Sequence, residues 1–129
     1  MDQRILKEIL AQYEEKRRAH EAEEARRREE IAKKHPDLNC LLEQRHEMVM
    51  GSVRDAFLGE EAQAVEARMA EYNRAIAEGL RRCGYPADYL APIQDCPQCV
   101  DTGFYYDAGS VRRPCECLKK AYLAALSTQ

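Results

Sequence analysis

Four cysteines lie close together in the stretch CPQCVDTGFYYDAGSVRRPCEC, which covers residues 96 to 117. Cys96 and Cys99 form a C-x2-C pair, and Cys115 and Cys117 form a C-x-C pair. Two short chelating pairs of thiolates are a donor set that binds Zn2+ in a tetrahedron. The spacing therefore predicts a structural zinc site with Cys96, Cys99, Cys115 and Cys117 as its ligands.

The residues between the two pairs predict a β-hairpin. Phe104-Tyr105-Tyr106 has strand character, as does the start of the segment 110–113, and Asp107-Ala108-Gly109 favours a turn. A turn about Ala108-Gly109 sets Tyr106 opposite Val111 and Phe104 opposite Arg113. The two cysteine pairs then meet at the open end of the hairpin.

Other uses of the four thiols stay open at this stage. An iron–sulfur cluster takes the same soft ligands, and two disulfides or a site in which a histidine replaces one cysteine are further alternatives. The three histidines, expected at exposed or helix-end positions, are His20, His35 and His46. Disulfides are disfavoured because the N-terminus is not a secretory signal, and a reducing cytoplasm is the expected location.

The remaining features of this region predict structure rather than catalysis. Asp101-Thr102-Gly103 matches the aspartic-protease triplet, but that chemistry needs two carboxylates in one site, so we expect a turn eased by Gly103. No acid or base stands among the cysteines as a catalyst, and we expect no enzyme activity.

Cys40 and Cys83 lie alone in helical patterns and are expected to act as small apolar residues. Four nearby cations are expected to offset the charge of the metal site: Arg112, Arg113, Lys119 and Lys120.

The rest of the chain has helical periodicity. A first helix over residues 2–34 carries apolar side chains on one face near its start: Ile5, Leu6, Ile9, Leu10 and Tyr13. Its later part consists largely of Glu and Arg or Lys at i,i+4 spacing, which predicts a solvated helix or, as an alternative, a coiled-coil arm. No stretch approaches the ~18 apolar residues of a membrane span, so we expect no membrane partner.

Two further helices follow a break at His35-Pro36. Gly59 is expected to end the second helix, and Glu60-Glu61 to begin the third, which ends near Gly84. The predicted fold is mainly α: N-terminal helices forming a helical hairpin or small bundle, then a small zinc-binding β-hairpin and a short C-terminal helix. The predicted division is a helical partner-binding region, residues 1–83, and a zinc-binding hairpin with C-terminal helix, residues 84–129.

The order of these features resembles the N-terminal region of DnaC/DnaI-type proteins, the bacterial and phage loaders of the replicative helicase. The resemblance is carried by GYPADYL and by CPQCVDTGFYYDAGSVRRPCECLKK, over residues 84 to 120, and by layout alone over residues 1 to 83. It implies that the four clustered cysteines bind zinc and that the N-terminal region grips the hexameric helicase. In such loaders an AAA-plus ATPase follows.

This sequence departs from the family pattern at its end. It stops at Gln129, about where the ATPase should begin, and it lacks G-x-x-x-x-G-K-[ST], so we expect no ATP binding from these residues. We expect either an excised N-terminal domain or a natural stand-alone version.

The apolar face near the N-terminus is the candidate site for the helicase. Helix-in-groove docking uses anchors at i, i+3, i+4 and i+7, and Ile5, Leu6, Ile9, Leu10 and Tyr13 supply such a set. The alternative is that these residues complete the core against the other two helices.

Two other classes of protein stay open. A zinc-containing module that binds single-stranded DNA weakly is favoured by the cations near the cysteines and by Tyr105 and Tyr106, but the net charge of −3 disfavours it. A chaperone-like zinc domain is suggested only by the C-P-x-C-x-x-x-G start, which occurs once here.

Overall fold

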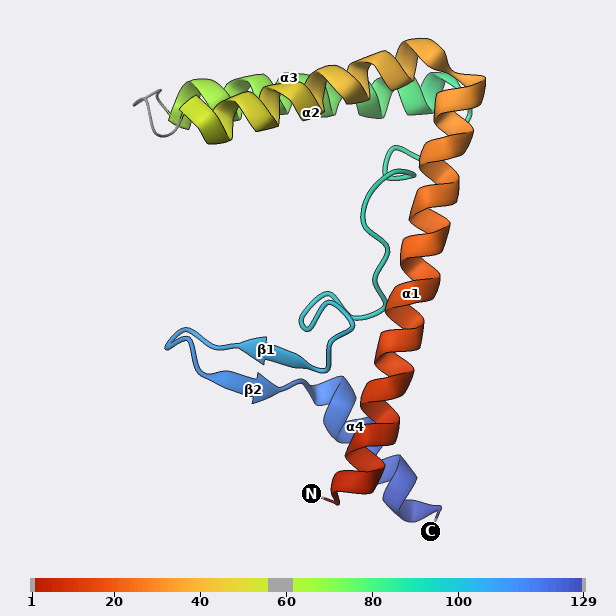
Figure 1. The fold of residues 1–129 in the computed structure, drawn as a ribbon, viewed down its shortest axis with the longest axis vertical. Helices are drawn as coiled ribbons and strands as arrows, with labels where there is room; N and C mark the ends of the chain where they lie inside the picture. The colour runs from red at the N-terminus through yellow and green to blue at the C-terminus, as the bar shows by residue number, and fades with distance from the viewer. Residues whose placement is uncertain (1, 56–61, 129) are drawn as a thin grey trace. The chain divides into compact units, whose positions relative to one another are not determined.

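The protein is mainly helical, as predicted, in a computed structural model that describes residues 2–55 and 62–128. In chain order the elements are α1 (Gln3–Lys34), α2 (Pro36–Asp55), α3 (Ala62–Arg82), β1 (Phe104–Tyr106), β2 (Arg112–Pro114) and α4 (Glu116–Ser127) (Figure 1). The two strands pair in antiparallel fashion. None of these described helices is long and apolar enough to cross a membrane.

The chain forms two compact units that divide it differently from the predicted boundary after residue 83. One unit combines residues 1–24 with residues 92–129, and the other is residues 25–91. The boundary falls within α1 because the part of this helix before residue 25 and the part after it contribute to different hydrophobic cores. The first part of α1 forms one compact unit with the cysteine-rich segment, although about seventy residues of chain separate the two in sequence.

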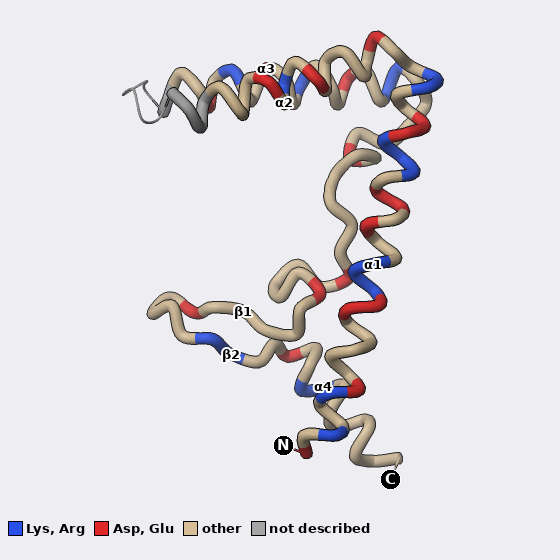
Figure 2. The backbone as a smooth tube through the Cα atoms, viewed as in Figure 1, with Lys and Arg blue, Asp and Glu red and all other residues tan. Residues whose placement is uncertain are grey.

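The charged part of α1 is a solvated helix. Figure 2 shows basic and acidic residues alternating along it. Ion pairs at the predicted i,i+4 spacing include Glu14 with Arg18 at 2.8 Å, and Glu29 with Lys33 at 2.9 Å. Glu24 instead accepts a hydrogen bond from the backbone N–H of Ile93 at 3.1 Å. Its carboxylate therefore holds the connecting segment that precedes the cysteines.

Residues 25–91 contain the predicted helical hairpin of α2 and α3. Pro36 occupies the first position of α2, where its missing N–H costs nothing. At the other end, α3 ends at Arg82, and Gly84 follows with a φ of 88° that suits glycine. Tyr85 N–H bonds to Leu80 O and Gly84 N–H to Arg81 O, the Schellman pattern of a helix end. The predicted stop at Gly59 and start at Glu60-Glu61 lie outside the described residues.

The core of this unit gathers at one end of the hairpin. Its buried residues come from the last turns of α1, the start of α2 and the end of α3: Ile31, Leu38, Ile76 and Leu80. Tyr85, Tyr89 and Leu90 of the following segment pack against them. Between Glu43 and Met50 on α2, and between Ala64 and Ala75 on α3, every side chain is exposed or half-buried.

The other unit packs the first turns of α1 against α4 (Figure 1). Its buried residues are Ile5, Ile9, Tyr13, Leu118 and Tyr122, and Leu6 and Leu10 pack half-buried against them. The predicted partner-binding anchors Ile5, Leu6, Ile9, Leu10 and Tyr13 thus pack against the chain itself, which fits the alternative that they complete a core. The covering element is α4 rather than the other two long helices.

The hairpin forms between the predicted segments, but its register is shifted by one residue. Phe104 pairs with Pro114, and Tyr106 pairs with Arg112 rather than Val111. The reason is a loop organised by Asp107, whose carboxylate accepts hydrogen bonds from the N–H groups of Gly109 and Val111 at 2.9 and 3.0 Å. Ser110 takes a left-handed φ of 59° to close this loop.

Candidate metal centre

The four cysteines predicted as ligands lie together. Their Sγ atoms all fall within 4.8 Å of one another, with Cys96 and Cys115 separated by 3.7 Å and Cys99 and Cys117 by 3.6 Å. A regular tetrahedron with metal–sulfur bonds of about 2.3 Å has sulfur–sulfur edges of about 3.8 Å. The donor set and its spacing could therefore hold one metal ion.

Each cysteine pair is positioned by a different element. Cys96 and Cys99 lie on a turn ahead of β1, where the N–H of Val100 bonds to Cys96 O at 2.9 Å. Cys115 precedes α4 and accepts two backbone hydrogen bonds from its first turn, while Cys117 lies within that turn. The N-terminus of a helix carries partial positive charge, which favours thiolates at this place.

Several residues just after Cys99 have positive φ angles, which L residues rarely adopt. Val100 and Asp101 have φ values of 51° and 59°, and Gly103 has 87°. Gly103 O then accepts the N–H of Cys115 at 2.8 Å, which ties the two cysteine pairs together. A Cβ at Gly103 would lie 3.4 Å from Leu10 and Tyr13, so the backbone there packs directly on α1.

Replacing Gly103 by alanine is expected to destabilise this unit by about 1–2 kcal/mol, because an L side chain disfavours the left-handed conformation. Chemical denaturation of the metal-loaded chain measures the effect. Gly109→Ala is the matched control, since that glycine is exposed and has no left-handed φ. Equal stability of the two variants would contradict the role given to Gly103.

Asp101 is the buried polar group that holds the first cysteine turn. Its side chain is 2% exposed, and its carboxylate accepts hydrogen bonds from the N–H of Cys96 at 2.9 Å and of Asp95 at 3.0 Å. Arg17 donates to its backbone carbonyl at 2.7 Å. Burial alone raises the pKa of Asp101, but the two N–H donors, His20 and Lys16 outweigh burial and lower it. The expected turn is present, and its carboxylate stabilises it.

His20 was not expected near the cysteines, yet it lies beside this turn. Its Nδ1 is 3.1 Å from Asp101 and its Nε2 is 3.5 Å from Asp95, and only 18% of the side chain is exposed. The two nitrogens lie near different carboxylates, and Nδ1 makes no hydrogen bond within the part of the chain that the structure describes. No sequence signal marked this contact, because α1 brings His20 to Asp101 from far along the chain.

The thiols differ in acidity when no metal is bound. Hydrogen bonds with Cys99 lower the pKa of Cys96 to about 7, whereas burial raises the pKa of Cys117 to about 12 and also raises that of Cys115. Metal ions bind the deprotonated sulfur, so binding must release protons and become stronger as the pH rises.

Tyr13 is a further neighbour of the cysteines that the sequence did not mark. Its hydroxyl oxygen lies 2.9 Å from Cys117 Sγ. Burial, with the hydrogen bond and charge of Cys117, raises the pKa of Tyr13 well above its usual value. The phenol therefore keeps its proton.

Three of the four cations expected to offset the metal site have partners of their own. Arg113 pairs with Asp107 at 2.9 Å, and Lys119 pairs with Glu116 at 3.1 Å. The guanidinium of Arg112 lies 3.9 Å from the centre of the Phe104 ring. These contacts leave the hairpin with less free positive charge than the sequence suggests.

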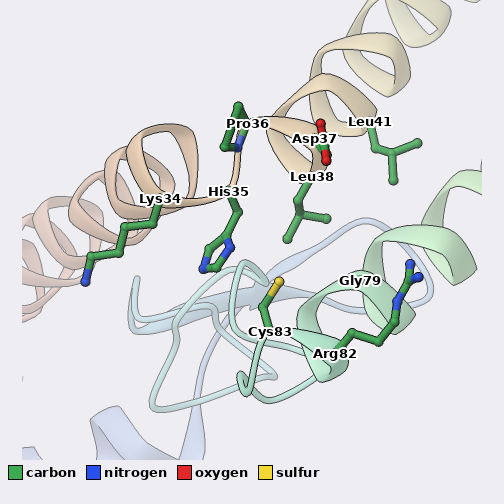
Figure 3. Close-up of a pocket in the computed structure, with 9 residues that line it drawn as sticks. All are labelled: Lys34, His35, Pro36, Asp37, Leu38, Leu41, Gly79, Arg82 and Cys83. Atoms are coloured by element: carbon green, nitrogen blue, oxygen red, sulfur yellow. The ribbon is translucent and has the colours of Figure 1, made fainter.

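Cys40 and Cys83 are not among the four clustered cysteines, and both are exposed rather than packed as apolar residues. Cys83 lines a pocket of about 380 Å3 at the corner between α1 and α2 (Figure 3). Lys34, His35 and Arg82 lie around the same pocket. The pocket combines no nucleophile and base in contact, and we assign it no chemistry.

Comparison with family models, with curated proteins and with solved structures finds no match to this chain.

Proposed function

We propose that the chain is the N-terminal helicase-interaction domain of a bacterial or phage replicative helicase loader of the DnaC/DnaI type, stabilised by a structural zinc ion. The observation that carries the proposal is the convergence of Cys96, Cys99, Cys115 and Cys117 at tetrahedral spacing. These cysteines belong to the motif on which the family resemblance rests.

Zinc is the metal that best fits the four sulfurs. Their separations of 3.6 and 3.7 Å match the edges expected around a single ion, whereas an iron–sulfur cluster would hold the thiolates farther apart. A disulfide needs sulfur atoms about 2.05 Å apart, and the six cysteines are free. Four sulfur ligands complete the coordination of zinc, so the site would stabilise the fold and leave no open position for a substrate.

The α2–α3 hairpin is the surface we assign to the helicase. Its buried core lies at one end, and farther along the hairpin the apolar side chains are only half-buried: Met48, Val49, Val65, Met69 and Tyr72. Two helices alone cannot fully bury these apolar side chains, and a helix or groove of the partner would cover the part that stays exposed. This assignment replaces the one based on the first turns of α1, which pack on α4.

Binding to the hexameric helicase of the same organism tests this assignment. We expect the metal-loaded chain to bind, and the double variant Val49→Gln/Met69→Gln to lose about tenfold in affinity or more, which corresponds to about 1.4 kcal/mol. Glu47→Gln/Ala70→Gln changes exposed positions of the same helices and should bind as the wild type does. Circular dichroism of each variant checks that helicity is retained.

Absence of binding by the intact, metal-loaded chain at micromolar concentrations would contradict the helicase-loader proposal. The module that binds single-stranded DNA would then lead. Salt-dependent binding of an oligothymidylate would support it. We place it second because Arg113 and Lys119 are paired with carboxylates and Arg112 covers the Phe104 ring.

A further inference from the structure

Tyr13 joins the first helix to the candidate metal centre. The tyrosine and Cys117 are 104 residues apart in sequence, and the hydroxyl oxygen lies 2.9 Å from the cysteine sulfur. The Tyr13 side chain is 7% exposed, among Ile9, Leu118 and Tyr122. The packing of the ring therefore fixes the position of the hydroxyl.

The direction of this hydrogen bond follows from metal chemistry. A cysteine that binds zinc does so as a thiolate, which carries no proton and can only accept. The phenol of Tyr13 must then be the donor. Groups that donate hydrogen bonds to metal ligands orient those ligands, and their loss typically weakens metal binding.

Cys117 is the ligand whose sulfur Tyr13 of α1 contacts. It is half-buried, as Cys96 is, whereas Cys99 and Cys115 are 3% and 1% exposed. A hollow of about 240 Å3 adjoins it, lined also by Ile9, Gln12, Tyr13 and Lys16. Without the Tyr13 hydroxyl, water from this hollow would take its place as the hydrogen-bond partner of the Cys117 sulfur.

We propose that Tyr13 is a metal-positioning residue, whose hydroxyl donates to the Cys117 thiolate and couples metal binding to the docking of the first turns of α1 on α4. The inference rests on the proposed metal site and goes beyond it, because it makes α1 part of the metal centre. The coupling is reciprocal: a hydrogen bond that strengthens metal binding lets the metal stabilise the docked helix by the same amount.

Tyr122 provides a matched control. It lies in the same core, is 9% exposed, and its hydroxyl accepts a hydrogen bond from the backbone N–H of Asp2 rather than contacting a cysteine. Tyr13→Phe and Tyr122→Phe each remove one buried hydroxyl and keep the ring. A loss that is merely structural would affect both variants.

The experiment measures the dissociation constants of Zn2+ and Co2+ for the full chain by competition with a chelator. We expect Tyr13→Phe to bind about 10- to 100-fold more weakly than the wild type, and Tyr122→Phe to bind within about twofold of it. The sulfur-to-cobalt absorption bands should shift only in Tyr13→Phe, because only that change alters a ligand atom's hydrogen bond. This readout is independent of stability.

Unchanged metal affinity in Tyr13→Phe, or equal losses in both variants, would overturn the role of Tyr13 while leaving the metal site standing. If the wild type itself binds neither ion, both the metal site and this inference fail. Helicase binding is not part of the measurement, so the proposed partner is tested separately.

Discussion

Replacing Cys115 by serine is expected to release the metal ion and to unfold the unit made of residues 1–24 and 92–129. Cys115 is 1% exposed, and its carbonyl accepts the first two backbone hydrogen bonds of α4. The strands of this unit have three residues each, and its buried core is small. Structural zinc contributes about 10–16 kcal/mol of apparent folding free energy in zinc-finger peptides, which so small a unit cannot replace.

Hydrogen exchange followed residue by residue measures this effect. Protection should be lost between residues 96 and 127 and in the first turns of α1, and retained in α3, whose packing does not use the metal. A chelator should have the same effect on the wild type, and added zinc should reverse it there but not in Cys115→Ser. Cys83→Ser, at an exposed cysteine outside the cluster, is the control. Full protection in the Cys115→Ser chain would contradict a metal-dependent fold.

A charged residue at position 9 is expected to destabilise the same unit severely. Ile9 is 5% exposed in the core between α1 and α4. Removing a buried aliphatic side chain of this size costs about 2–5 kcal/mol, and a carboxylate without a partner adds the cost of its desolvation. Ile9→Asp should therefore leave the unit largely unfolded.

Tyrosine fluorescence during urea unfolding measures the change, since Tyr13 and Tyr122 lie in this core. Gln12→Asp places the same charge at an exposed position of α1 and should change stability by less than about 0.5 kcal/mol. If Ile9→Asp kept full stability and lost only partner binding, the face would be a docking surface after all. That result would contradict the packing of α1 on α4.

Features set by neighbouring residues could be predicted from the sequence. Pro36 marks the start of a helix because its ring fixes φ at a helical value. Gly84 marks the end of one because glycine readily adopts a left-handed φ. Both effects act within a few residues. The spacing of Cys96, Cys99, Cys115 and Cys117 identified the cluster because two chelating pairs on one hairpin have few ways to meet. Apolar periodicity identified Ile5 and Ile9 as one face of a helix.

Features set by distant residues could not be predicted. Periodicity shows that a face is apolar, but it does not say which element covers it, so α4 was not identified as the partner of α1. The contact of Tyr13 with Cys117 and that of His20 with Asp101 join segments far apart in the chain. The hairpin register depends on hydrogen bonds to the Asp107 carboxylate rather than on strand propensity.

Native mass spectrometry of the chain purified without chelators tests the metal centre most directly. We expect the added mass of one zinc ion per chain, which should disappear in Cys115→Ser and remain in Cys83→Ser. A wild-type chain that carries no metal, or that has lost the mass of four hydrogens through two disulfides among the clustered cysteines, would contradict it.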